Sequence, residues 1–285
     1  MLVQPVLASP ETASGRRFWR KLVRGPGMLV GLVVVAIVAV VAIFAPVLAP
    51  YDLLELGRSF QPPSATHLLG TDSLGSDVFS NLIAGARTSL TVGLFAAATS
   101  AIVGVTVGSI AGYCGGTVDQ ILMRVTEMFQ ILPQFFLAVV IVALFGASIW
   151  NIIIVIGILT WPATARLTRA EFLRLRNAEF VDAARSIGIS HRRILLGVIL
   201  PNASPPIIVN SALQISSAIL LETSLSFLGL GDPNITSWGT MLHNAQDYFS
   251  RAWWMAVFPG LALFCTTLSL NLLADGLNDA LNPKS

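Results

Sequence analysis

Long apolar runs separated by polar connections dominate the pattern of this chain. Several runs reach the ~18–20 residues needed to cross the hydrocarbon core of a bilayer. They predict six transmembrane helices, over 28–49, 88–112, 128–146, 149–166, 205–229 and 254–276. We therefore expect an all-α membrane protein with six spans.

One polar stretch interrupts this pattern between the fourth and fifth spans, "EFVDAARSIGISHRRILLGVILPN" over 179–202. Phe180, Ala183, Ala184 and Ile187 recur at i, i+3, i+4 and i+7, which predicts one apolar stripe along a short helix. Gly188 then suits the left-handed position that ends many helices.

A second short helix is predicted after this glycine, with Ser190 as its N-cap and an end at Pro201. Each helix has only about ten residues, fewer than the ~12–15 that make an isolated helix marginally stable in water. Both therefore need a surface to pack against. The periodicity leaves two alternatives open: a groove on another protein, or the membrane surface, which nearby arginines would favour.

Composition agrees with a membrane protein. The chain is 54% hydrophobic and 11% charged, with a mean hydropathy of +0.76, whereas soluble domains carry about 25% charged residues. Cys114 and Cys265 lie far apart in the sequence, and no cluster of histidine or cysteine has metal-ligand spacing, so neither a disulfide nor a metal site is predicted.

The basic residues predict the orientation of the spans, because arginine and lysine near spans remain on the cytoplasmic side. They concentrate in the N-terminal tail and in the connection between spans four and five. Both termini are therefore predicted to be cytoplasmic. The expected segments are a tail over 1–27, a first span over 28–49, an extracytoplasmic loop over 50–87, a permease core over 88–277 that contains a cytoplasmic loop at 167–201, and a tail over 278–285.

Small and polar residues recur at helical spacing inside the spans. Small residues at every fourth position of the second span let another helix approach closely, either in a partner subunit or in the same chain: Ser100, Gly104, Gly108 and Gly112. Polar residues of the later spans either line a substrate path or form interhelical hydrogen bonds: Gln130, Gln134, Asn210, Gln214, Ser217 and Glu222. Pro133 and Pro162 are expected to interrupt spans three and four.

The chain contains no G-x-x-x-x-G-K-[ST] motif, and neither of its two lysines, Lys21 and Lys284, follows a glycine. No nucleophile elbow or pair of acids within a span indicates catalysis. An enzyme is therefore not expected. If ATP drives a process here, another polypeptide must bind it.

The polar loop resembles the EAA loop of ABC importer permeases, written EAA-x3-G-x9-I-x-L-P. "DAARSIG" is followed nine residues later by "VILP", with Asp182 in place of Glu and Val198 in place of Ile. "HLLGTDSLGSDVFSNLIAGARTSL" and "SLSFLGLGDPNITSWGTML" are similar to the second permease subunit of dipeptide and oligopeptide importers, in the peptide/nickel group.

This resemblance implies a type I importer fold in the cytoplasmic membrane of a bacterium or archaeon. It implies a homologous second permease, two ATPase subunits that bind ATP and Mg, and an extracytoplasmic binding protein, with no nucleic acid and no cofactor in this chain. The cargo would be a di- or oligopeptide, or alternatively nickel or another small solute. An ion-coupled secondary transporter is a disfavoured alternative, because it would need paired ionisable residues at span centres, and the centres of the predicted spans contain none. The resemblance places these residues in or beside an ATPase cleft: Glu179, Phe180, Val181, Asp182, Ala183, Ala184, Arg185, Ile187 and Gly188.

Overall fold

The computed structural model describes residues 26–53, 55 and 57–281, so the predicted tails fall mainly outside it. The described residues form helices, with one isolated β-bridge between Thr71 and Asp77. The α-helices are α2 (Pro26–Ile43), α3 (Ala45–Leu48), α4 (Val78–Cys114), α5 (Gly116–Ile131), α6 (Gln134–Phe145), α7 (Ile149–Leu175), α8 (Glu179–Ser186), α9 (His191–Ile194), α10 (Leu200–Leu225), α11 (Trp238–Ala245) and α12 (Trp254–Leu281).

Five helical segments of the described chain are long and apolar enough to span a membrane, and α5 with α6 makes a sixth if the bent pair counts as one span. The all-helical prediction is confirmed. The third span is not the single straight helix expected over 128–146, because α5 and α6 meet at a bend of 80°. Leu132 is extended before Pro133, as the steric demand of a proline ring favours. Pro162, in contrast, lies inside a continuous α7.

Helix α4 begins at Val78, so the connection predicted over 50–87 is shorter than expected. Asp77 explains this start, because its Oδ2 accepts hydrogen bonds from the backbone N–H and the hydroxyl of Ser80, at 2.8 and 2.9 Å. His67 Nδ1 lies 2.9 Å from the other oxygen, Oδ1. With 37 residues, α4 is about 55 Å long at 1.5 Å per residue, longer than a bilayer core is thick.

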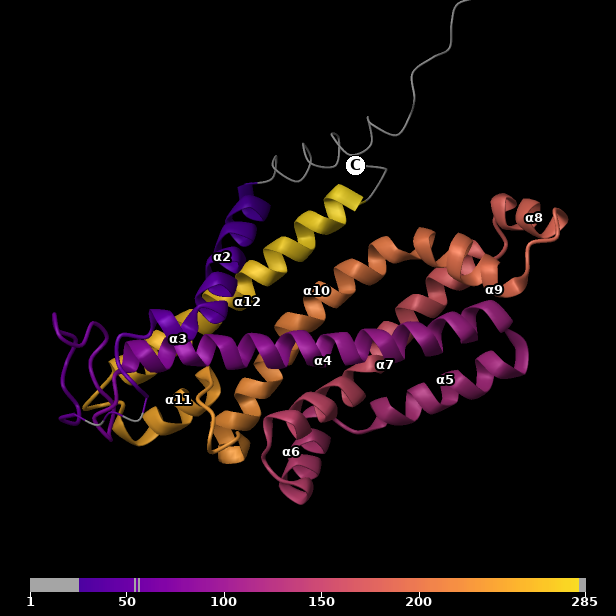
Figure 1. Ribbon diagram of the computed structural model, residues 1–285. Coiled ribbons are helices and arrows are strands. Elements are labelled where there is room, and N and C mark those ends of the chain that lie inside the picture. Colours follow the sequence, from indigo (N-terminus) through magenta and orange to yellow (C-terminus); the bar gives the residue numbers. More distant parts are fainter. Residues whose placement is uncertain (1–25, 54, 56, 282–285) are drawn as a thin grey trace, which may run out of the picture.

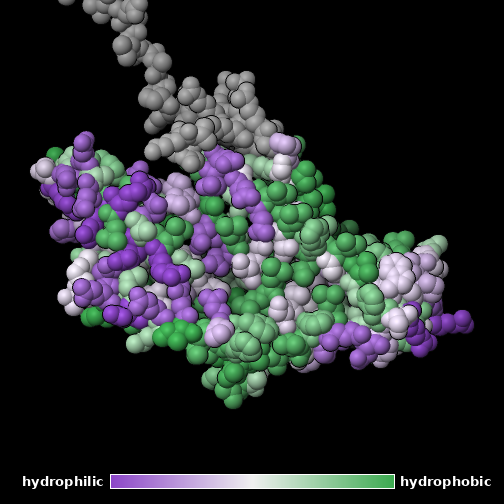
Figure 2. Space-filling view, turned by 180° about the vertical axis from the view of Figure 1, so that it is seen from behind, coloured by the Kyte–Doolittle hydropathy of each residue, from purple (hydrophilic) through white to green (hydrophobic). Residues whose placement is uncertain are grey.

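The ends of α4 lie at opposite ends of the molecule (Figure 1). Helix α11 lies beside the first turns of α4, and α8 and α9 lie beyond its last turns; we call these the α11 end and the α8 end. Helices α7 and α10 pack against α4, and α2 packs against α12. Figure 2 shows apolar residues over the middle of one face and polar residues gathered toward both ends, as a transmembrane protein requires.

The predicted stripe of small residues on α4 faces α7 of the same chain. A Cβ added to Gly104 would lie 2.6 Å from Thr164 Cβ, and one added to Gly112 would lie 2.6 Å from Phe172 Cβ. Ser100 is also buried, and its hydroxyl has no hydrogen-bond partner among the described residues. The close approach therefore joins α4 to α7, which leaves no room for a partner subunit along this stripe.

Two tryptophans tie the α11 end together. Trp238, the first residue of α11, donates from Nε1 to the carbonyl of Leu82 in α4, at 3.1 Å. Trp254, the first residue of α12, donates from Nε1 to the carbonyl of Thr71, also at 3.1 Å. These long-range bonds hold the 57–77 connection, α4, α11 and α12 in a fixed arrangement.

Candidate functional site

The α8 helix is an independent short element at the α8 end of the molecule. Glu179 and Asp182 lie in its first turn and Arg185 in its last, a charge order that complements the helix dipole. The helix ends in a Schellman arrangement: Gly188 N–H donates to the Arg185 carbonyl at 3.0 Å, and Ile189 N–H donates to the Ala184 carbonyl at 3.2 Å. Gly188 has φ +79°, the left-handed conformation that its sequence position predicts.

Helix α8 buries a different face from the predicted stripe. Val181, which the stripe omitted, is fully buried, and Ala184 is 7% exposed. Both belong to a buried cluster whose other members come from the neighbouring helical segments: Phe172, Leu175, Ile194, Ile199, Ala203 and Ile207. Phe180 and Ile187 are 43% and 77% exposed, and Ala183 is exposed too. The predicted stripe is therefore divided, with Ala184 facing its own chain and the other three facing outward.

The second helix of the loop was predicted to end at Pro201, and this prediction is wrong. Helix α9 continues through a π-helical turn, Leu195–Ile199, directly into α10. Pro201 is the second residue of α10, which directly follows this π-helical turn, so Pro201 lies inside a continuous helical segment. Ser190 occupies the N-cap position, but its side chain makes no capping bond.

The loop is fastened to the C-terminal end of α4 by side chains of α4, α8 and α9 and by Arg176, the residue that follows α7. The Tyr113 hydroxyl lies 2.7 Å from His191 Nδ1 at the start of α9. Arg176 donates from Nη1 to the Gly112 carbonyl, at 3.2 Å, and Arg185 of α8 donates from Nη2 to the Arg176 carbonyl, at 3.2 Å. The carbonyl of Gly112 is one that a helix end leaves without an intrahelical partner, so Arg176 both caps α4 and holds α8.

A bidentate ion pair fixes α5 to α7 close to these contacts. Arg169 donates from Nε and Nη2 to the two carboxylate oxygens of Asp119, at 2.5 and 2.6 Å. The fork of a guanidinium matches a carboxylate in this geometry. Neither this pair nor the Tyr113–His191 contact is predicted from the sequence. The partners lie 50 and 78 residues apart, and no local pattern indicates such pairs.

Of the two glutamines in the predicted third span, one forms an interhelical hydrogen bond and the other does not. Gln134 donates to the Leu159 carbonyl of α7 at 3.1 Å, whereas the half-buried Gln130 makes no side-chain hydrogen bond with any described residue. Both residues flank the bend between α5 and α6. The bond from Gln134 secures the start of α6 against α7.

On α10, the three predicted positions behave differently from one another. Asn210 donates to the Thr164 hydroxyl of α7 at 3.0 Å, and Ser217 is exposed and bonds to the Leu213 carbonyl of its own helix. Gln214 is half-buried, and its amide has no hydrogen-bond partner in the described part of the chain. Gln214 is therefore the one residue of the three whose side chain makes no hydrogen bond in the described part of the chain.

Glu222 is 2% exposed at the other end of α10. Its Oε1 accepts a hydrogen bond from the Ser226 hydroxyl at 2.7 Å, and the Thr223 hydroxyl lies 3.5 Å from Oε2. Burial among hydroxyls gives this carboxyl the donors that an acid away from water needs. None of the six predicted polar residues lines the large cavity at the α11 end.

The fold and the loop at the α8 end are those of a transport permease, a class whose chains are membrane components and not catalysts. Residues 104–285 match the model of the binding-protein-dependent transport system inner membrane component family, and residues 14–63 match the N-terminal TM domain of oligopeptide transport permease C. The chain belongs to this family of ABC importer permeases, multi-pass proteins of the cytoplasmic membrane, as the resemblance of its loop predicts.

Relatives match almost the whole chain. The di/tripeptide transport system permease protein DppC of Pseudomonas aeruginosa is 42% identical over 278 residues, which cover 94% of this chain and 92% of the relative. The glutathione transport system permease protein GsiD of Escherichia coli O157:H7 is 42% identical over 271 residues, covering 94% and 89%. An inward-facing structure of the MetNI methionine ABC transporter has the same fold, with a TM-score of 0.59, 15% identity and coverage of 71% of this chain and 96% of that one.

Proposed function

We propose that this chain is one of two permease subunits of an ATP-driven importer of short peptides. In this assignment it forms half of the translocation path. The cargo is argued from the peptide permeases to which the chain is 42% identical over 94% of its length. Glutathione, the cargo named for GsiD, is itself a peptide, so both groups of relatives support the same solute class.

The exposed face of α8 is the observation that supports coupling of this chain to ATP hydrolysis in a partner subunit. Phe180 and Ile187 expose large apolar side chains at a polar end of the molecule, where an uncovered apolar face is unfavourable. Val181 and Ala184 fix the opposite face of α8 to its own chain. A groove on an ATPase subunit would cover Phe180, Ala183 and Ile187, with Asp182 and Arg185 at its rim.

The orientation and the partners follow from this assignment. The α8 end and both termini face the cytoplasm, and the 57–77 connection and α11 face outward, where a binding protein delivers the cargo. Two ATPase subunits bind ATP and Mg. The homologous second permease completes the path, to which Gln130 and Gln214 contribute polar groups.

The test is uptake of radiolabelled dialanine by the complete complex in proteoliposomes, with its binding protein. We expect uptake that requires ATP, and Ile187→Glu should abolish it because the charge cannot enter an apolar groove. The matched control is the conservative Ile187→Leu, which keeps an apolar side chain at this position and should retain uptake. An importer that moves another solute but not dialanine would refute the cargo, and ATP-independent uptake would refute the driving mechanism.

A further inference from the structure

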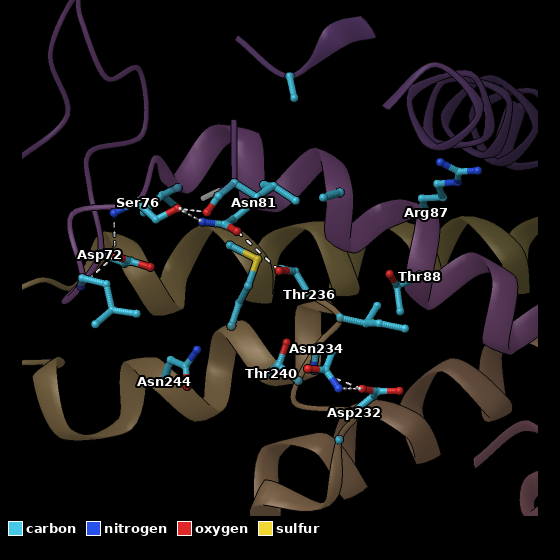
Figure 3. A pocket seen from close by; sticks show the side chains of 18 of the residues that line it. Asp72, Ser76, Asn81, Arg87, Thr88, Asp232, Asn234, Thr236, Thr240 and Asn244 are labelled. Carbon is cyan, nitrogen blue, oxygen red and sulfur yellow. Dashed lines mark hydrogen bonds between the residues drawn. The ribbon is translucent and has the colours of Figure 1, made fainter. Parts of the chain in front are cut away.

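A large cavity opens at the α11 end of the molecule, far from α8. Its volume is about 1360 Å³, larger than the ~300–1,000 Å³ of most small-molecule sites. Figure 3 shows Asn81 and Thr88 projecting from α4 and Asn234 and Thr240 facing them from the other side, with Thr236 between. The walls therefore present polar groups to whatever enters.

Two of the acids that line this cavity already hold the local backbone. Asp72 Oδ1 accepts hydrogen bonds from the N–H groups of Leu74 and Ser76, at 2.9 and 2.8 Å. Burial raises the pKa of the Asp72 carboxyl above its usual value, although these backbone bonds oppose the rise.

The second acid, Asp232, is held in the same way. It accepts from Ile149 N–H at 3.1 Å and from Asn234 N–H at 3.0 Å, and thereby joins the start of α7 to the connection before α11. Its carboxylate is committed to this junction.

Arg87 differs from these two acids because its charged group has no partner among the described residues. It is exposed, and its guanidinium makes no hydrogen bond or ion pair with any residue that the structure describes. It is also the one arginine or lysine among the described residues that line the cavity. Arg87 lies on α4 one residue before Thr88, and in Figure 3 its side chain extends from the helix away from Thr88 and Asn234. A guanidinium is always charged and presents a planar fork of donors that matches a carboxylate.

We propose that Arg87 binds the C-terminal carboxylate of the peptide in this cavity, as the peptide leaves the binding protein. The inference rests on the proposed function, which supplies a cargo with a free carboxylate. Arg87 would then be a substrate-binding residue of the permease itself, at one part of the wall of this large cavity. The binding protein would not be the sole site at which the charged end of the peptide is recognised.

The first experiment measures dialanine uptake by the complete complex at saturating binding protein. Arg87→Gln should lower the uptake rate about tenfold, the effect of losing a charge-assisted hydrogen bond, and Arg87→Glu should lower it further by repelling the carboxylate. Arg87→Lys should restore part of the rate because it keeps the charge. Arg124→Gln is the matched control, since Arg124 is an exposed helical arginine away from the cavity, and it should leave uptake unchanged. Normal uptake by Arg87→Gln overturns the inference.

A second experiment identifies what Arg87 meets. Ala84 lies one turn before Arg87 on α4 and also lines the cavity, so a photoreactive p-benzoylphenylalanine there can capture labelled dialanine during turnover. We expect label on this chain, reduced about fivefold or more by Arg87→Gln through the lost charged hydrogen bond. Label that is absent or independent of Arg87, or crosslinks to the binding protein or the second permease in place of the peptide, overturns the inference. A wild-type complex that does not import dialanine refutes the proposed cargo instead.

Discussion

The hydroxyl of Tyr113, in the last turns of α4, lies 2.7 Å from Nδ1 of His191, the first residue of α9. The two rings also meet edge to face, with centroids 6.0 Å apart. This contact joins the loop that carries α8 to the helix that reaches the cavity at the α11 end. Helix α4 is continuous over its 37 residues, so displacement of the loop can move the far end of α4 as a rigid rod.

Tyr113→Phe should weaken this link without disturbing the packing, because it removes one hydroxyl and keeps the ring. A solvent-exposed hydrogen bond contributes about 0.5–1.5 kcal/mol, so we expect dialanine transported per ATP hydrolysed to fall about two- to tenfold. The measurement is uptake and ATP hydrolysis in the same proteoliposomes. His191→Ala and the double variant complete a mutant cycle. If the effects of the two single changes simply add, the hydrogen bond does not carry the coupling.

Gly188→Pro should abolish transport while the chain still inserts into the membrane. Proline fixes φ near −65° and has no N–H, whereas Gly188 has φ +79° and donates to the Arg185 carbonyl. The turn after α8 would therefore be lost. Immunodetection of the chain in membranes, together with uptake, separates the two effects.

Gly197→Ala is the matched control for this glycine. It lies in the same loop, and an added Cβ would have only Arg193 Cγ near it, at 4.0 Å. We expect normal uptake from Gly197→Ala. Normal uptake from Gly188→Pro would show that the geometry of this turn is not needed for coupling.

Gly112→Ala should destabilise the protein, because the new Cβ would lie 2.6 Å from Phe172 Cβ and 2.8 Å from the Arg169 carbonyl. Overpacking of this kind costs about 1–3 kcal/mol. Gly260→Ala in α12 is the matched control, since a Cβ there meets nothing within 4 Å and alanine favours a helix by about 0.5–1 kcal/mol. Thermal unfolding in detergent should give a lower Tm for the first variant and an unchanged or higher Tm for the second. Equal Tm values would contradict the close α4–α7 packing.

Local features of this protein could be predicted from sequence, and features that depend on distant partners could not. The turn at Gly188 and the break at Pro133 follow from the residues at those positions. The buried face of α8 depends on Ile194 and Ile199, which return to α8 only after the loop has folded. The apolar spacing therefore indicated the helix and the stripe of Phe180, Ala183 and Ile187 that is left exposed, but it did not indicate that Val181 and Ala184 pack against the same chain.

The start of α4 is a second feature that hydropathy alone did not predict. Hydropathy placed the beginning of the span near residue 88, where the continuous apolar run begins. Asp77 begins the helix at Val78 through its bonds to Ser80, a capping signal that lies in a polar segment. Arg87 consequently lies on a helix and beside a cavity, although its sequence position indicated only the side of the membrane.

Gln214 and Asn210 lie one turn apart on α10 and should respond differently to leucine. Asn210 donates to the Thr164 hydroxyl, and Thr164 is 1% exposed. Asn210→Leu should therefore lower stability by about 1–3 kcal/mol, because a buried hydroxyl loses a partner.

Gln214→Leu should leave stability within about 0.5 kcal/mol, because the amide makes no hydrogen bond within the described chain. If Gln214 faces the translocation path, the same substitution should change dialanine uptake or the basal ATP hydrolysis of the complex, since a polar group that meets the cargo or the second permease is replaced. Thermal unfolding and transport measured on both variants test this contrast. A Gln214→Leu variant with unchanged uptake and unchanged ATP hydrolysis would assign Gln214 to helix packing alone, and it would remove this residue from the path.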